Sequence, residues 1–193
     1  MSLVIGLCGA KGSGKDHFYH TIKKLYPHRN INKVAYADPI KHKVMHIFNL
    51  QSEAEYDTFK RRDVQYSLGN RVAEQDGRHI VREIGMMMRE YDEYQFVNYV
   101  ETKIFDSISE DPTAIWCITD LRFQNELESI IYPLDGKVVK IKRVGYEYDG
   151  HITEKEFRDD QCDIILKNDT NNIEDYEANI RQVFEKLINE ENQ

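Results

Sequence analysis

The feature that most constrains this chain is the glycine-rich stretch at residues 9–16, which reads Gly-Ala-Lys-Gly-Ser-Gly-Lys-Asp. It follows the apolar run 3–8, which is short enough for a buried strand, and it precedes residues 17–25, whose pattern predicts a helix. A strand, a glycine loop and a helix in this order are the context that a phosphate-binding loop requires. The alternative is a glycine-rich turn that only joins a strand to a helix.

The residue types of this stretch suit a nucleoside triphosphate. Glycines let the backbone curl so that successive N–H groups point at an anion, and the N-terminus of the following helix adds partial positive charge. Lys15 stands where its ammonium can reach the outer phosphates. The next position usually carries a Ser or Thr hydroxyl for Mg²⁺, and here it is Asp16. A carboxylate facing phosphates needs a cation between them, so Asp16 is predicted to hold Mg²⁺, directly or through water.

The composition indicates a soluble globular protein with a single domain over residues 1–193. Hydrophobic residues make up 40% and charged residues 31% of the chain, and no apolar run approaches the ~20 residues of a membrane span. We therefore expect a cytoplasmic protein without a membrane partner. The net charge of −8 argues against binding to a nucleic-acid duplex but permits a local basic pocket for a nucleotide. Cys8, Cys117 and Cys162 are expected to be reduced, buried thiols.

Five strand-like runs alternate with helical patterns along the chain and predict a parallel α/β sheet with helices on both faces. The runs cover residues 3–8, 32–37, 113–120, 137–143 and 162–167. Ligands gather at the carboxyl ends of such strands. The residues expected at this edge are Lys15, Asp38, Asp120, Arg143 and Asn168.

Asp120 ends an apolar run that reads as a buried parallel strand beside the first one. In phosphate-loop enzymes such a strand delivers a carboxylate to the Mg²⁺ water shell, so Asp120 is a candidate metal ligand. The alternative is that Asp120 is the N-cap of the helix expected to begin at Leu121. The first turn of that helix would bring Arg122 close to the same pocket.

The region 38–110 is expected to be mostly helical. Lys41, one turn into a helix that starts at Asp38-Pro39, either meets an anion or is a solvated lysine, and its spacing does not decide between the two. Residues 52–70 are polar and predict a mobile helical flap. Residues 78–108 form a helical block with a break near Asp92-Glu93, and its methionines are expected to pack in the core. Arg82 and Arg89 lie seven apart, on one face, and could grip a phosphate.

A polar loop over residues 144–160 follows the fourth strand. It holds four polar side chains of interest, namely Asp149, His151, Thr153 and Glu154. Its length and charge are typical of a lid that closes over a nucleotide.

Several motifs, in this order, resemble the deoxynucleoside monophosphate kinases of tailed bacteriophages. They are Gly14-Lys15-Asp16, Ala37-Asp38-Pro39-Ile40-Lys41, the block 78–89, Asp120-Leu121-Arg122-Phe123-Gln124-Asn125-Glu126, residues 149–154 and residues 163–170. The resemblance covers almost the whole chain. It implies a P-loop NTPase fold of the nucleoside monophosphate kinase type, ATP and Mg²⁺ as cofactors, a deoxynucleoside monophosphate (dNMP) as acceptor, and a product used in phage DNA synthesis.

The resemblance also implies roles for single residues. The triphosphate would lie in the cradle formed by Lys11, Gly12, Ser13, Gly14, Lys15, Asp16 and His17. Asp16 and Asp120 would order Mg²⁺. The acceptor phosphate would lie near Asp38, Lys41, Arg82, Arg89 and Arg122, and the ATP base or lid near Arg143 and Asn168. Related enzymes suggest a homodimer, located in the host cytoplasm if a phage encodes the chain.

Some positions depart from that family. His17 replaces the usual Thr, a Gln is expected near Arg82, and a Thr is expected near Met86, so the choice of acceptor base cannot be transferred. Animal-type phosphomevalonate kinases are a similar alternative, since they share Gly-Lys-Asp and the Asp-x-Arg after the central strand. A guanine-nucleotide switch is a third hypothesis, but it predicts a late Asn-Lys-x-Asp motif that the sequence lacks.

Overall fold

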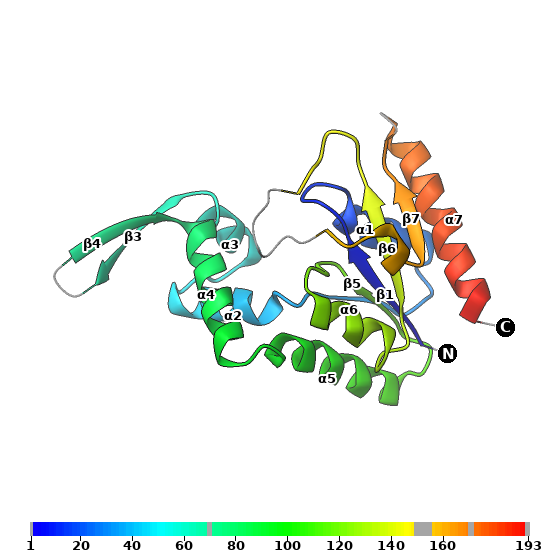
Figure 1. Ribbon diagram of the computed structural model, residues 1–193, viewed down its shortest axis with the longest axis horizontal. Helices are drawn as coiled ribbons and strands as arrows, with labels where there is room; N and C mark the ends of the chain where they lie inside the picture. Colours follow the sequence, from blue (N-terminus) through cyan, green and yellow to red (C-terminus); the bar gives the residue numbers. More distant parts are fainter. Residues whose placement is uncertain (1, 69–70, 149–155, 170–171, 192–193) are drawn as a thin grey trace. The chain divides into compact units, whose positions relative to one another are not determined.

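The first strand, β1 (Leu3–Cys8), is buried along its entire length and lies at the centre of a five-stranded sheet. We describe a computed structural model, in which residues 2–68, 71–148, 156–169 and 172–191 are placed. The chain forms two compact units, one from residues 1–36 with 97–193 and the other from Ala37–Phe96. Figure 1 shows the elements of both units.

The sheet of the first unit has the order β2-β5-β1-β6-β7, and every neighbouring pair is parallel. The other four strands are β2 (Ile31–Val34), β5 (Ile115–Ile118), β6 (Lys137–Lys142) and β7 (Ile164–Lys167). The five parallel strands predicted from the sequence are therefore confirmed, although most of them are shorter than their apolar runs. Because β5 and β6 flank β1, their carboxyl ends reach the loop that follows β1 from both sides.

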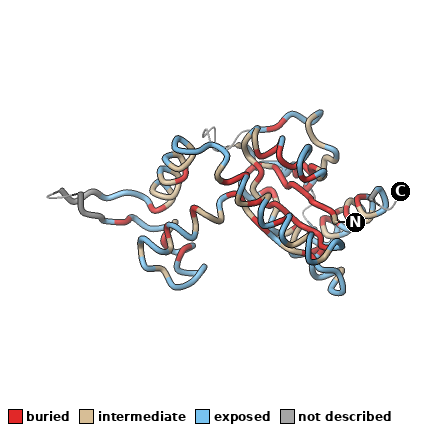
Figure 2. The backbone as a smooth tube through the Cα atoms, turned by 90° about the horizontal axis from the view of Figure 1, so that it is seen from below, coloured by how far each residue is buried: buried red, intermediate tan, exposed pale blue. Residues whose placement is uncertain are grey.

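Helices cover both faces of this sheet, which explains why its strands are apolar on both sides. On one face α1 (Lys15–Leu25) and α7 (Ile173–Glu191) pack together, and Phe18 and Phe184 enter the same core cluster as Ile5. On the other face lie α5 (Gln95–Glu110) and α6 (Gln124–Ile131), joined by the hydrogen bond from Ser129 Oγ to Glu101. A short 3₁₀ helix, Asp159–Gln161, precedes β7. Figure 2 shows the buried residues concentrated along the central strands.

The second unit combines three helices with a β-hairpin. Its elements are α2 (Asp38–Ile47), α3 (Glu53–Phe59), β3 (Asp63–Leu68), β4 (Arg71–Asp76) and α4 (Gly77–Tyr91). The strands pair antiparallel from Asp63 with Asp76 to Leu68 with Arg71. Close contacts fix the helix packing, since a Cβ at Gly85 would lie 2.8 Å from the Ile40 side chain and one at Gly77 would collide with the Phe59 carbonyl.

Two expectations for this region need correction. The expectation of a polar helical flap over residues 52–70 is correct only for α3, because the strand β3 follows that helix. Val64, Tyr66 and Leu68 alternate with polar residues, and this period of two was the signal for a strand. The break near Asp92 is confirmed, because α4 ends at Tyr91 and α5 begins at Gln95. The expectation that the methionines pack in the core is wrong for Met87, a residue that is 62% exposed.

Within the part of the chain that the structure describes, we find no helix both long and apolar enough to span a bilayer.

We expect the substitution Phe184→Ala to lower the free energy of unfolding by about 3–5 kcal/mol, because it leaves a cavity between α7 and the sheet. The ring of Phe184 is fully buried and lies 4.9 Å from the ring of Tyr26 between centroids. Phe105→Ala is the matched control. Phe105 is 44% exposed, so its loss should cost less than about 1 kcal/mol. Urea unfolding followed by circular dichroism measures both, and equal losses would contradict the assigned core.

Candidate functional site: a phosphate loop

The glycine loop connects β1 to α1, as the sequence predicts, and its backbone needs glycine at the two ends. Gly9 and Gly14 have φ angles of 142° and 114°, in a region that other residues rarely adopt. A Cβ at Gly9 would also collide with the Ile141 carbonyl, and one at Gly14 would lie 2.7 Å from the Tyr176 hydroxyl. Gly14 is the N-cap of α1 and provides no side chain to bond the first N–H groups of the helix. These groups can therefore serve an anion.

Lys15, the first residue of α1, folds back over the loop. Its ammonium donates to the carbonyl oxygens of Gly9, at 2.6 Å, and Ala10, at 3.0 Å. These two contacts place a positive charge at the mouth of the loop. An ammonium is a compact point charge that suits the outer phosphates of a triphosphate.

Side chains from the end of β7 and from α7 donate hydrogen bonds to backbone carbonyls of the loop. The Asn168 amide donates to Ser13 O at 2.7 Å, in a buried position, and the Tyr176 hydroxyl donates to Gly14 O at 3.3 Å. Burial raises the pKa of Tyr176, so its hydroxyl keeps its proton. The His17 ring stacks on Tyr176 with centroids 5.7 Å apart, and its Nε2 lies 3.3 Å from Glu177 Oε1. Asn168, expected near the ATP base, thus contacts the loop itself.

The tip of the loop is gripped by two residues that follow β6, an arrangement that we call the tip clasp (Arg143 and Tyr146). Arg143 Nη1 donates to Gly12 O at 2.9 Å, and its guanidinium lies 4.3 Å from the centroid of the Tyr146 ring. Tyr146 in turn packs on Gly12, because a Cβ there would lie 2.6 Å from the ring. The turn at Gly145, with φ of 78°, brings the ring back to the loop. Lys11, beside the clasped tip, is exposed.

Asp16 pairs with a lysine from the sheet. Its Oδ1 lies 2.5 Å from Lys33 Nζ, although the Asp16 side chain is 70% exposed. The contact places a positive charge against this carboxylate at the start of α1. In the described residues no group of three or more His, Cys, Asp or Glu side chains could hold a metal ion. Mg²⁺ needs only one or two carboxylates when phosphates and water complete its shell, so the residues present fit this ion.

Asp120 follows β5, the strand next to β1. Its Oδ1 accepts a hydrogen bond of 2.7 Å from the backbone N–H of Tyr36, which follows β2. The carboxylate therefore links the ends of two adjacent strands at the edge where the loop lies. The alternative that Asp120 is an N-cap is wrong, because α6 begins only at Gln124.

Glu126 shapes the turn that carries Arg122, and the sequence reasoning missed it. Its buried carboxylate accepts from the backbone N–H groups of Arg122, at 2.8 Å, and Phe123, at 3.0 Å, through the same oxygen. The Tyr36 hydroxyl donates to the Glu126 carbonyl at 3.1 Å. An acid at the third position of a helix is a capping signal, and here it fixes the path from Asp120 to α6.

The remaining predicted residues, Asp38, Lys41, Arg82 and Arg89, lie in the second unit. Asp38 opens α2, and Lys41 forms an ion pair with Glu53 of α3. Arg82 and Arg89 belong to α4, and the guanidinium of Arg89 lies 4.5 Å from the centroid of the Phe96 ring. Their part in the site stays a prediction.

A hollow of about 460 Å³ adjoins the loop in the first unit. Its lining is polar and charged, and it includes Ala10, Lys142, Glu147 and Tyr148 beside the clasp. The expected lid over residues 144–160 begins at this hollow, but its polar residues Asp149, His151, Thr153 and Glu154 lie outside the described residues.

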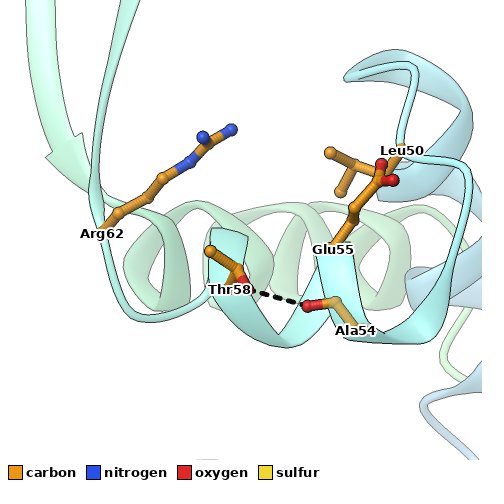
Figure 3. Close-up of a pocket in the computed structure, with 5 residues that line it drawn as sticks. All are labelled: Leu50, Ala54, Glu55, Thr58 and Arg62. Carbon is orange, nitrogen blue, oxygen red and sulfur yellow. Dashed lines mark hydrogen bonds between the residues drawn. The ribbon is translucent and has the colours of Figure 1, made fainter.

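Another hollow, of about 380 Å³, lies in the second unit between α3 and the segments beside it (Figure 3). It is lined by Leu50, Ala54, Glu55, Thr58 and Arg62. Thr58 bonds back to Ala54 O at 2.9 Å, and the side chains of Glu55 and Arg62 extend from opposite sides of the hollow. None of its residues was among the predicted site residues.

Comparison with known proteins finds a related viral sequence. No protein-family model matches the chain. A protein of Acanthamoeba polyphaga mimivirus named "Putative deoxynucleotide monophosphate kinase" is 28% identical over 174 residues, which cover 86% of this chain and 88% of the mimiviral protein.

Solved structures of two bacterial kinases are similar in outline. A sugar kinase from Janibacter sp. has a TM-score of 0.46 at 12% identity, with 95% of this chain and 92% of that chain covered. Shikimate kinase from Bacteroides thetaiotaomicron has a TM-score of 0.41 at 14% identity, with 96% and 98% covered. Both TM-scores are low, so the fold rests on the sheet order and the loop described above. A parallel sheet of this order, with a glycine-rich phosphate loop between its central strand and the first helix, makes it a P-loop NTPase fold.

We expect Tyr146→Ala to weaken the binding of ATP by about three- to tenfold, because the loop tip loses the ring that packs on Gly12 and orients Arg143. Tyr146→Phe keeps the ring and should stay within about twofold of the wild type. Isothermal titration calorimetry with ATP and Mg²⁺ measures the dissociation constant of ATP for both variants. Equal weakening by the two substitutions would assign the effect to the hydroxyl and contradict the clasp.

Proposed function

We propose that this protein is a deoxynucleoside monophosphate kinase, which transfers the γ-phosphoryl group of ATP to a dNMP and releases dNDP and ADP. The general activity is that of an ATP-dependent phosphotransferase. The observation that carries it is Lys15 held over a glycine loop beside the acid-tipped strand β5. The named activity of the mimiviral relative, together with the ordered motifs of the sequence, supports a nucleotide as the acceptor.

The chain's own groups account for the binding of the triphosphate. The N–H groups at the start of α1 and the ammonium of Lys15 face the phosphates, while Arg143 adds positive charge at the loop tip. Asp16 and Asp120 would hold Mg²⁺, which neutralises charge on the β- and γ-phosphates when it is bound. Asn168 and Tyr176 keep the loop carbonyls in place, so the cradle needs little rearrangement when the nucleotide arrives.

Transfer to a monophosphate needs no strong general base, because the attacking phosphate oxygen is already ionised. The transition state spreads negative charge over the migrating group, and fixed positive groups stabilise it. We assign this role to Lys15 and Arg122. The turn organised by Glu126 fixes the backbone at Arg122 just beyond Asp120.

The second unit carries the residues that we assign to the acceptor phosphate. Lys41 of α2 and Arg82 and Arg89 of α4 supply cations for the acceptor phosphate, with Asp38 at the start of α2. Arg89 is partly oriented by its stacking on Phe96. Use of the product in DNA precursor synthesis, a phage origin, location in the host cytoplasm and a homodimer belong to the same proposal.

The acceptor is tested by the release of ADP from ATP and Mg²⁺ with dGMP, dTMP, dCMP, dAMP, their ribose counterparts and mevalonate 5-phosphate, each added separately. We expect turnover with at least one deoxynucleotide, at least about tenfold faster than with its ribose counterpart, a difference of ~1.4 kcal/mol in barrier. Turnover with mevalonate 5-phosphate alone would replace the proposed acceptor. ATP hydrolysis unaffected by every acceptor would contradict a kinase that uses these compounds.

The loop chemistry is tested by two substitutions. Lys15→Ala should lower kcat/KM by at least about a hundredfold, or ~2.7 kcal/mol, because it removes the charge at the loop mouth. Lys24→Ala, at an exposed position of the same helix, is the control and should stay near wild type.

Asp120→Asn retains an acceptor for the Tyr36 N–H but loses the negative charge. We expect Asp120→Asn to lower kcat/KM about as much as Lys15→Ala does, without a change in thermal stability. Full activity of this variant would mean that Asp120 only links the ends of β5 and β2.

A further inference from the structure

Two cysteine thiols that the proposed function does not use are in contact beside the loop. Cys8 Sγ and Cys162 Sγ lie 3.9 Å apart, although the residues are separated by 154 positions in the sequence. Cys8 ends β1 and is buried as expected, whereas Cys162 precedes β7 and is partly exposed, so the expectation of a buried thiol is wrong for Cys162. The third thiol, Cys117, is buried in β5. The two thiols in contact therefore differ in access to solvent.

A buried cation lies close to the pair. The segment that carries Cys162 is pinned by Lys140, which pairs with Asp159 and whose side chain is 3% exposed, and the Cys162 thiol, while protonated, donates to the Arg158 carbonyl at 3.6 Å. Burial disfavours the charge on Lys140, but hydrogen bonds to Glu156 and Asp159 outweigh it and raise its pKa, so the ammonium stays charged. Lys140 accordingly provides a fixed positive charge near both sulfurs.

The two thiols are shifted in opposite directions. A hydrogen bond from the Cys8 thiol lowers the pKa of Cys162, with Lys140 helping, while burial and the carboxylates of Asp159 and Asp163 oppose the shift. The hydrogen bond to Cys162 and burial raise the pKa of Cys8. Burial also raises the pKa of Cys117, to about 12. A partly exposed thiol of lowered pKa beside a buried thiol of raised pKa is the arrangement of an oxidation-sensitive cysteine with a resolving partner.

We propose that Cys162 is a site of oxidation by a peroxide and that Cys8 resolves it to an intramolecular disulfide. With hydrogen peroxide, the Cys162 thiolate attacks one oxygen, the O–O bond breaks, and the departing hydroxide takes a proton and leaves as water. The sulfenic acid so formed is attacked by the sulfur of Cys8, which gives up its proton. The S–O bond breaks and a second water leaves. The two thiols lose two electrons, and the peroxide is reduced to two waters.

This disulfide would act on the phosphate loop because Cys8 directly precedes Gly9. The two sulfurs must approach by about 2 Å to reach the length of an S–S bond. The loop has little room to follow, since Gly9 is packed against Ile141 O and Ser13 Oγ and its own carbonyl accepts from Lys15. A shift at Cys8 therefore displaces the carbonyl that positions the ammonium. We expect the oxidised protein to bind ATP about five- to tenfold more weakly, at the low end of coupling between sites.

The experiment uses the full chain treated with a small excess of hydrogen peroxide, unfolded in an alkylating agent and analysed by mass spectrometry. The expected product has lost two hydrogens, contains a Cys8–Cys162 peptide pair and carries one alkyl group, on Cys117. In Cys8→Ser the disulfide cannot form, and dimedone should trap the sulfenic acid on Cys162. Three alkylated cysteines after treatment, an intermolecular disulfide, or equal oxidation of Cys117 would each overturn the proposal.

A second variant guards against misfolding of Cys8→Ser. Cys162→Ser should bind ATP like the reduced wild type and should be indifferent to peroxide. The wild type should lose ATP affinity on oxidation and regain it with dithiothreitol, as measured by titration. An unchanged affinity in protein shown to carry the disulfide would overturn the coupling to the loop. Equal loss of affinity in Cys162→Ser would assign the damage to another residue.

Discussion

The hydrogen bonds to the carbonyl oxygens of the phosphate loop are what the rest of the site depends on. The loop has no regular secondary structure, and it is fixed by donors from outside it, namely Asn168, Tyr176 and Arg143. Lys15 bonds two further carbonyls from within. With its carbonyls held from behind, the loop can present N–H groups and the ammonium to an anion without first becoming ordered.

The parallel sheet explains how residues so far apart in sequence meet at one loop. Because β5 and β6 flank β1 with the same direction, the segments that follow them arrive at the same edge. Asp120 comes from one side and the tip clasp from the other. The Asp120 bond to the Tyr36 backbone extends this edge to β2. The site is thus a property of strand order, and the loop supplies only one part of it.

The sequence was sufficient where one local pattern determined the structure. Continuous apolar runs predicted the five parallel strands, and the loop motif predicted the position of Lys15. Partners that depend on tertiary packing were not predictable from spacing. Examples are the Lys33 ammonium beside Asp16, the Glu53 carboxylate beside Lys41 and the amide of Asn168 behind the loop. In each of these pairs the two residues come from elements that only the folded chain brings together.

Other differences from the predicted structure have a signal in the sequence, or arise because a helical pattern does not report burial. The hairpin was signalled by the alternation from Val64 to Leu68 and by Gly69-Asn70, a pair typical of two-residue hairpin turns. Glu126 is an acid at the third position of α6, and this position is a capping signal in the sequence. Met87 shows the reverse error, since an apolar stripe on a helix indicates which face is apolar but not whether another element covers it.

Gly9 and Gly14 are required by the backbone and the packing of the loop itself. Their left-handed φ angles and their contacts with Ile141 and Tyr176 would exclude larger residues whether or not a nucleotide ever binds. The fold alone would therefore preserve these glycines in a descendant that has lost its activity. Backbone geometry sets no such limit at Lys15, whose ammonium bonds the Gly9 and Ala10 carbonyls and supplies the positive charge of the loop. A relative that keeps the glycines but replaces this lysine is better regarded as an inactive pseudoenzyme than as a kinase with an altered loop.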